Sequence, residues 1–241
     1  MVGKLYGLGL GPGDPELITL KAHRILTSVK VVAYPAPDNG PSFARRIAAS
    51  YLDDSQLEVP FIVPMRVERR PARDVYDEAA KSIALHLDSG SDVAVLCEGD
   101  PFFYGSFMYL FERLSGVYET EIVPGVSSVM ASAAASGQPL AARNDIFTVI
   151  PAPLDDDVIR ARIQASDAFA IMKIGRHFGR IRALLADMNL LEQAAYVERV
   201  SLPEQKLSRL ADKLDADAPY FSVILVYKGS EDWIIKGHTK R

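Results

Sequence analysis

Three segments of the chain place glycines beside residues that could bind a ligand. They are GLGLGPGDPELIT (7–19), CEGDPFFYGS (97–106) and VPGVSSVMASAAASGQPL (123–140). Each segment follows a short apolar run and precedes a further apolar stretch, which is the setting of a turn between a strand and a helix. Ligands of open parallel sheets bind at the carboxyl ends of the strands, where such turns lie. The three turns together therefore predict one large crevice.

The first segment resembles a loop for a dinucleotide phosphate, but its spacing is wrong for one. The fingerprint G-x-G-x-x-G needs a third glycine, and the chain has Pro12 or Asp14 there, depending on the starting glycine. The fingerprint also needs an acidic residue at the end of the next strand, which here ends in YPAP (34–37). Asp14 would place a carboxylate where a pyrophosphate should bind. A capped turn and a different binding role both stay open.

The second segment could hold a flat or hydroxyl-bearing ligand. Gly99 would let a ligand approach the backbone, Asp100 could accept hydrogen bonds, and the rings at 102–104 could form an apolar wall. A plain Asp-Pro turn is an equally good explanation. Cys97 is the chain's one cysteine, and without a histidine nearby it is better explained as a small buried residue than as a nucleophile.

The third segment is a Pro-Gly turn followed by a helix of small residues that ends at Gly137. Ser127 and Ser128 stand where this helix begins, and capping of its first turn explains them without a ligand. The alanines and serines would also let another backbone or a ligand come close.

The elements that must position these turns alternate between strands and helices, which predicts an α/β fold with largely parallel sheets. The predicted strands are residues 4–10, 30–34, 59–64, 92–97, 120–123, 146–150, 168–174, 194–200 and 220–228. A helix is predicted from Pro15, with Asp14 as its N-cap, and another over 74–89, ending at Gly90. We expect two α/β domains, 1–120 and 121–241.

Composition narrows the class of protein. The 241 residues are 49% apolar and 24% charged, with a formal net charge of −4, which argues against a protein that works by neutralising nucleic-acid phosphate. The four histidines are far apart in sequence, so no metal site is expected. No apolar run is long enough to span a membrane and no signal-peptide pattern begins the chain, so we expect a cytoplasmic protein.

Taken together, the three segments resemble the signature motifs of the tetrapyrrole methylases, which transfer methyl groups from S-adenosylmethionine. Their order and spacing match, and weaker similarity at 168–177, 196–205 and 218–226 extends the resemblance over nearly the full chain. Within the family, FARRIA (43–48), CEGDPFFYGSFMYL (97–110), IMKIGRH (171–177) and PYFSVILV (219–226) are most similar to enzymes of cobalamin synthesis.

The resemblance implies a two-domain homodimer that folds its cofactor into a crevice between the domains and binds the tetrapyrrole in an adjoining trough. The implied cofactor-binding residues are Pro35, Gly99, Asp100, Phe103, Tyr104, Ser127, Ser128, Met172 and Tyr220. The implied wall of the trough is Gly11, Pro12, Gly13 and Asp14. The residue that takes up a proton in the reaction is not identified by any pattern.

A tetrapyrrole substrate carries several carboxylates, so basic residues should border its trough. Arginine suits this task because its planar group binds carboxylates through two hydrogen bonds. Arg69 and Arg70 are the predicted pair, and the further candidates are Arg45, Arg46, Arg66, Arg73, Arg143, Arg176, His177 and Arg180.

Three alternatives compete with this interpretation. The first is a methylase of the same architecture that acts on another ring carbon, on a protein or on ribosomal RNA. The second is a nicotinamide-dependent oxidoreductase, and the third is a ligand-binding or scaffold protein without catalysis. The broken dinucleotide fingerprint argues against the second.

Overall fold

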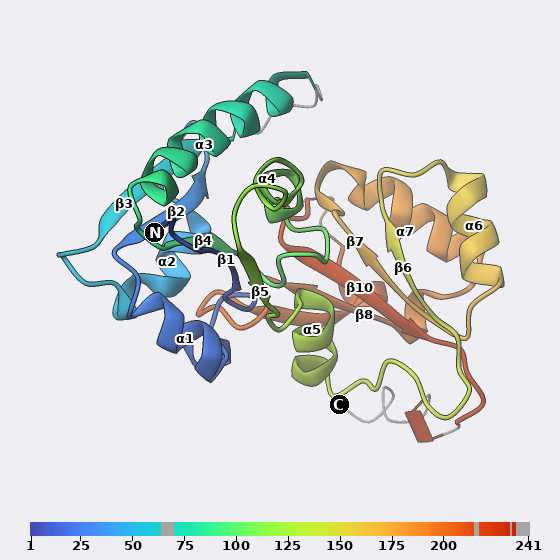
Figure 1. Cartoon of the computed structure of the whole chain (residues 1–241). Helices are drawn as coiled ribbons and strands as arrows, with labels where there is room; N and C mark the ends of the chain where they lie inside the picture. The colour runs from blue at the N-terminus through green and yellow to red at the C-terminus, as the bar shows by residue number, and fades with distance from the viewer. Residues whose placement is uncertain (64–69, 215–216, 232, 235–241) are drawn as a thin grey trace. The chain divides into compact units, whose positions relative to one another are not determined.

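The computed structural model describes residues 1–63, 70–214, 217–231 and 233–234, and at 70–72 only the backbone. The chain forms two compact units, Met1–Ser127 and Ser128–Arg241, each with its own sheet (Figure 1). The division falls after the strand at 120–123, whereas the predicted domains were 1–120 and 121–241. That the ranges 1–120 and 121–241 are two separate domains stays a prediction.

The first unit has a five-stranded sheet in the order β3-β2-β4-β1-β5, and every pairing in it is parallel. Its strands are β1 (Leu5–Gly9), β2 (Val31–Ala36), β3 (Leu57–Ile62), β4 (Val93–Cys97) and β5 (Thr120–Val123). Every residue of β4 is buried, as expected for a central parallel strand covered on both faces.

Helices cover both faces of this sheet (Figure 1). They are α1 (Leu20–Leu26), α2 (Phe43–Ala48), α3 (Arg70–Asp88) and α4 (Phe107–Leu114). Alternate residues of β4 point to opposite faces, so Val93 and Val95 pack with α3 and α4 while Ala94 and Leu96 pack with α1 and α2. The predicted class, α/β, is confirmed.

The helix predicted from Pro15 is divided into two pieces. A 3-10 turn occupies Pro15–Leu17, capped by Asp14, whose carboxylate accepts the Glu16 N–H at 2.9 Å. The α-helix begins only at Leu20, where the Thr19 hydroxyl accepts the Ala22 N–H at 3.1 Å. The prediction of one helix from Pro15 is therefore wrong, because a second capping residue, Thr19, starts a new helix at Leu20.

The second unit has a mixed sheet in the order β6-β7-β10-β8-β9, in which only β6 and β7 are parallel. Its strands are β6 (Phe147–Pro151), β7 (Ala168–Met172), β8 (Ala194–Glu198), β9 (Lys206–Arg209) and β10 (Ser222–Tyr227). The prediction of largely parallel sheets thus fails here. No helix joins β8 to β9 in the described residues, and a short connection favours antiparallel pairing.

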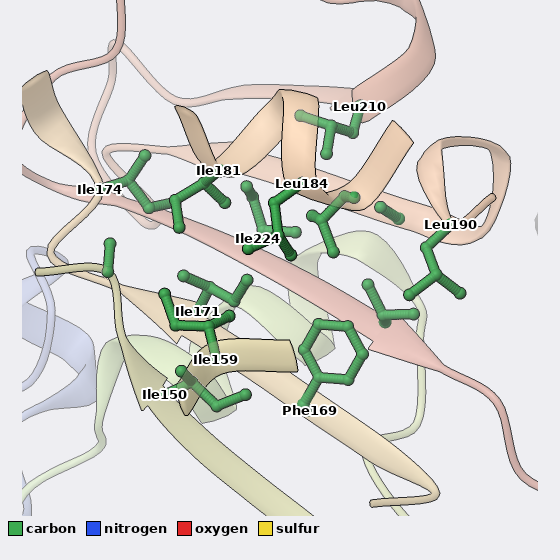
Figure 2. Close-up of a cluster of buried hydrophobic side chains, with 14 of the residues drawn as sticks. Ile150, Ile159, Phe169, Ile171, Ile174, Ile181, Leu184, Leu190, Leu210 and Ile224 are labelled. Atoms are coloured by element: carbon green, nitrogen blue, oxygen red, sulfur yellow. The ribbon is translucent and has the colours of Figure 1, made fainter. Parts of the chain in front are cut away.

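Three helices accompany this sheet: α5 (Ser128–Ser136), α6 (Asp156–Gln164) and α7 (Phe178–Asp187). The core forms where α6 and α7 pack on one face; Ile171 and Ile224 from the strands meet Ile181 and Leu184 from α7 (Figure 2). Helix α5 instead contacts β8 and β10 without belonging to this core.

Across the described ranges, no helix is both long and apolar enough to cross a membrane.

Candidate functional site

The three glycine-bearing turns of the sequence lie side by side in the first unit. Strand order places β1 between β4 and β5, and all three run in parallel, so their carboxyl ends share one edge of the sheet (Figure 1). We call the segments that follow them the opening turn (9–14), the Asp100 turn (97–106) and the Gly125 turn (123–127). The predicted grouping of the turns is confirmed within this unit.

Backbone hydrogen bonds join the opening turn to the Asp100 turn. The Leu10 N–H donates to the Cys97 carbonyl at 2.9 Å, and Gly11 and Gly99 exchange two bonds of 3.2 and 2.8 Å. Both glycines have positive φ, +77° at Gly11 and +65° at Gly99, which residues with a side chain adopt at a cost. The pairing of β1 with β4 therefore continues past the ends of the strands.

Close backbone contact also joins the Gly125 turn to the other two. A Cβ at Gly125 would lie 2.1 Å from the Gly99 carbonyl oxygen, and a Cβ at Gly9 would lie 2.4 Å from the Gly125 nitrogen. Neither position can hold a side chain without displacing backbone. These glycines are thus explained by the packing of three turns, with no nucleotide required.

Asp100 locks two of the turns together. One carboxylate oxygen accepts the Phe102 N–H at 2.9 Å within its own turn, and the other accepts the Gly125 N–H at 3.0 Å. A carboxylate oxygen can accept more than one hydrogen bond, so the group keeps acceptor capacity for a ligand.

The aromatic residues of the Asp100 turn separate into two groups. Phe102 packs with Phe107 and Phe111 of α4, at ring centroid distances of 6.1 and 5.1 Å. Phe103 and Tyr104 pack with each other at 5.1 Å, and Tyr104 is 42% exposed with a φ of +58°. Phe103 and Tyr104 are therefore the rings that could serve as a wall for a flat ligand.

The remaining predicted residues of the first unit occupy the same edge or border it. Gly11, Pro12 and Gly13 are buried, and Asp14 is half-buried. Pro35 lies near the end of β2, the neighbour of β4, and its carbonyl accepts the Ser42 hydroxyl at 2.6 Å. Ser42 in turn caps α2 through the Arg45 N–H.

Two predicted cofactor residues lie at one edge of the second sheet. Met172 ends β7, and Tyr220 precedes β10, which runs antiparallel beside it. A Cβ at Gly175 would lie 3.9 Å from the Tyr220 Cα, so the segments that follow β7 and precede β10 are neighbours. Of the two serines, Ser127 ends the first unit and Ser128 opens α5 in the second.

Three of the ten basic candidates have acidic partners in the described residues. Arg45 binds Glu58 through two bonds, of 2.6 and 2.7 Å, Arg143 pairs with Glu231 at 3.0 Å, and Arg180 pairs with Asp156. Such pairs leave less of the guanidinium for a substrate carboxylate. The predicted Arg69 lies outside the described residues, as does the side chain of Arg70.

Two glutamates that the sequence analysis did not single out lie at the ends of strands and differ in their partners. Glu98 follows β4, and burial raises the pKa of its carboxyl although the Ala44 N–H and its own N–H stabilise the charge. Glu198 ends β8, where it is buried and pairs with Lys213 at 3.2 Å. The location of Glu98 between Cys97 and Gly99 could have suggested a role, whereas no sequence signal connects Glu198 with Lys213.

Cys97 is buried, and burial raises the pKa of its thiol well above the ordinary value. A thiol with a raised pKa is a poor nucleophile at neutral pH. The prediction that Cys97 is a buried residue is confirmed. Within the described ranges, no three or more His, Cys, Asp or Glu residues are grouped to hold a metal ion.

Comparison with known proteins extends these observations. The chain is 40% identical over 98% of its length to the cobalamin biosynthesis protein CobIJ of Mycobacterium tuberculosis, of which the match covers 48%. It is 37% identical to a precorrin-2 C(20)-methyltransferase of a Sinorhizobium species, over 93% of this chain and 95% of that one. It is 36% identical to the cobalt-precorrin-2 C(20)-methyltransferase of Salmonella typhimurium, over 95% and 98%. The chain thus spans about half the length of the first curated relatives it matches.

A solved structure shows the same fold. The uroporphyrin-III C-methyl transferase of Thermus thermophilus, complexed with S-adenyl homocysteine, superposes with a TM-score of 0.64 at 23% identity, over 98% of this chain and 100% of that one. The family model for tetrapyrrole (corrin/porphyrin) methylases matches residues 4–213. The chain therefore belongs to the tetrapyrrole (corrin/porphyrin) methylase family.

Proposed function

We propose that the chain methylates precorrin-2 at C-20, with S-adenosylmethionine as methyl donor, to give precorrin-3A in cobalamin biosynthesis. The observation that carries this proposal is the 37% identity to the Sinorhizobium enzyme over nearly the full length of both chains. A family match over residues 4–213 supports the reaction class.

The residues of the Asp100 turn fit S-adenosylmethionine chemically. A Cβ added at Gly99 would meet its nearest atoms at 3.9 and 4.0 Å, an ordinary contact distance, so its positive φ and not crowding favours glycine there. Asp100 offers a carboxylate for an ammonium group, and the exposed Tyr104 offers a ring for a flat group. When bound, the cofactor supplies an electrophilic methyl group on a sulfonium.

We propose the following roles for the predicted residues. Gly99, Asp100 and Phe103 hold the amino-acid part of the cofactor, Ser127 and Ser128 face it, and Met172 lines the adenosine. Pro35, Tyr104 and Tyr220 also border the cofactor, while residues 11–14 border the tetrapyrrole. The crevice between the two domains stays a prediction.

The protein's main task in this reaction is alignment. A reduced tetrapyrrole has an electron-rich, enamine-like meso carbon that can attack a methyl sulfonium without prior activation by a base. Holding the reacting atoms in line can contribute on the order of 7–11 kcal/mol. The rigid packing of three turns around Gly9, Gly99 and Gly125 suits this task.

We further propose that Arg69 and Arg70 bind substrate carboxylates. Replacing both with alanine should raise the KM for the tetrapyrrole and leave the affinity for S-adenosylhomocysteine unchanged. Replacing Arg45 with alanine is the matched control, because Glu58 already occupies that guanidinium. Unchanged kinetics in the Arg69/Arg70 variant would contradict this role.

A second candidate substrate is cobalt-precorrin-2. It is favoured by the 36% identity to the Salmonella enzyme, which is nearly as high as the identity to the Sinorhizobium one. We also propose that the protein is a homodimer and that it acts in the cytoplasm.

An assay with both substrates tests the proposed function. The protein is incubated with S-adenosylmethionine carrying a ¹³C methyl group and with either precorrin-2 or its cobalt form, and the product is examined by mass spectrometry and NMR. One labelled methyl group on the C-20 meso carbon supports the proposal, and the more active substrate decides between the two candidates. A label on another carbon, or tight cofactor binding without methylation, would contradict it.

A further inference from the structure

Glu98 occupies the centre of the carboxyl edge of the first sheet. It follows the last residue of β4 and precedes Gly99, whose backbone pairs with Gly11 of the opening turn. It therefore lies within the Asp100 turn, proposed to hold the cofactor, and directly before the glycine that pairs with the turn proposed to border the tetrapyrrole.

The environment of Glu98 is that of a carboxylate without a cation. In the part of the chain that the structure describes, Glu98 makes no ion pair, and backbone N–H groups of Ala44 and of Glu98 itself hold its carboxylate. By contrast, Glu58 and Glu198 each have a basic partner within 3.2 Å. Glu98 is half-buried, and withdrawing a carboxylate from water without a basic partner is costly.

The groups around Glu98 do not lower its proton affinity by charge. Its neighbours Cys97 at the end of β4, Tyr76 on α3 and Asp100 in the same turn are neutral or negative, and α2 contributes the Ala44 N–H. Burial therefore dominates and raises the carboxyl pKa from its ordinary value of 4.5. A carboxylate with raised proton affinity is a better general base near neutral pH.

Methylation of a meso carbon needs a proton acceptor after the methyl group has been transferred. The meso carbon uses an enamine electron pair to form the new C–C bond, the methyl–sulfur bond breaks, and its electron pair stays on sulfur. The methylated carbon then carries both a hydrogen and the methyl group. Loss of that hydrogen as a proton returns the C–H electron pair to the conjugated ring, so the substrate gains CH₂ in total and one proton is released.

We propose that the Glu98 carboxylate accepts this proton. The inference rests on the proposed function and adds to it the acid–base residue that the reaction requires. The alternative is that Glu98 only satisfies the first turn of α2 through the Ala44 N–H, which the Ser42 cap leaves unpaired because Ser42 accepts from Arg45.

The Glu98→Gln variant separates the two roles, because glutamine keeps an acceptor for the Ala44 N–H and loses the base. We expect kcat to fall by about 10²–10⁴-fold, the usual contribution of a positioned acid or base. The affinity for S-adenosylhomocysteine, measured by calorimetry, and the hydrogen-exchange rate of the Ala44 amide should stay at wild-type values. Substrate deuterated at C-20 should show a larger isotope effect with the variant, because proton removal becomes rate-limiting.

Two controls keep the result interpretable. Glu112→Gln changes an exposed glutamate of α4 and should leave kcat unchanged. Glu98→Asp keeps a carboxylate and should recover part of the activity. A measurement on the unmodified protein needs no variant: kcat should fall as the pH decreases through a single ionisation above 4.5.

The possible failures are distinguishable. Wild-type kcat in the Glu98→Gln variant, or a wild-type kcat that does not change as the pH falls to 4.5, would overturn the role of Glu98 and leave the proposed function intact. If the unmodified protein does not methylate the tetrapyrrole at C-20, the proposed function fails and the role of Glu98 fails with it.

Discussion

The two sheets hold the segments at their proposed ligand-binding edges by different means. In the first unit, backbone contact between Gly9, Gly99 and Gly125 fixes three turns. In the second, a buried side-chain network fixes the end of β8: the Glu198 carboxylate accepts the Tyr196 hydroxyl at 2.8 Å and pairs with Lys213 at 3.2 Å. The Lys213 ammonium also lies 5.0 and 5.2 Å from the ring centroids of Tyr196 and Phe178.

The difference shows how one residue type takes two roles. Glu198 is neutralised by a partner and acts as an anchor for its strand. Backbone contacts among glycines hold the turn of Glu98, whose carboxylate has backbone N–H donors and, in the described ranges, no basic partner. Backbone contacts thus position this turn, and the Glu98 carboxylate is proposed to take part in the reaction.

Breaking the anchor of the second sheet should have the largest effect on stability. Lys213→Met leaves the buried Glu198 carboxylate with the Tyr196 hydroxyl at 2.8 Å and the more distant Lys206 ammonium at 3.8 Å. Removal of one member of a buried pair costs about 3–5 kcal/mol. The free energy of unfolding in urea measures the loss. The double variant Lys213→Met with Glu198→Gln should recover most of it; equal losses in the single and double variants would show that the ion pair is not the anchor.

Disturbing the glycine contacts of the first sheet should have an intermediate effect. Gly125→Ala places a Cβ 2.1 Å from the Gly99 carbonyl oxygen, and such overpacking costs about 1–3 kcal/mol. We also expect weaker binding of S-adenosylhomocysteine, because the Asp100 turn must move. Gly116→Ala is the matched control, since nothing lies within 4 Å of its added Cβ. Wild-type affinity and stability in Gly125→Ala would contradict the backbone account.

Neutralising Glu98 should have the smallest effect on stability of the three changes, and it should stabilise the protein instead of destabilising it. Its folded-state pKa is raised, so the stability that its protonated form contributes is present below 4.5 and is lost as the pH rises through the folded-state value. Glu98→Gln stays neutral and keeps that contribution. The melting temperature of the variant should exceed that of the wild type near neutral pH, and the difference should shrink as the pH falls toward 4.5. A lower melting temperature at neutral pH would show that the charge itself stabilises the fold.

Much of the first unit could be predicted from the sequence, because its signals are local. The apolar run 92–97 gave β4, and the glycines after three strands gave three turns at one edge. The prediction of Asp14 as an N-cap is confirmed, but Thr19 caps a separate helix after it. Because both residues can cap a helix, the sequence alone does not decide between one helix and two.

The second unit shows where local signals end. Strand β9 has the sequence KLSR and is exposed throughout, so no buried face marks it as a strand. Its extended conformation is explained by its pairing with β8 and not by a local sequence signal. The pairing of Glu198 with Lys213 likewise depends on tertiary structure, as does the capture of Arg45 by Glu58. The raised pKa of Glu98 follows from burial, which no motif encodes.

The position of bound S-adenosylhomocysteine, determined by crystallography of the protein co-crystallised with it, tests the assignment of the first sheet's edge most directly. We expect its amino-acid part to lie against Gly99, Asp100 and Phe103, with the opening turn left for the tetrapyrrole. A complex in which the adenosine stacks on residues 9–13 would contradict that assignment and restore the opening glycines as the nucleoside site.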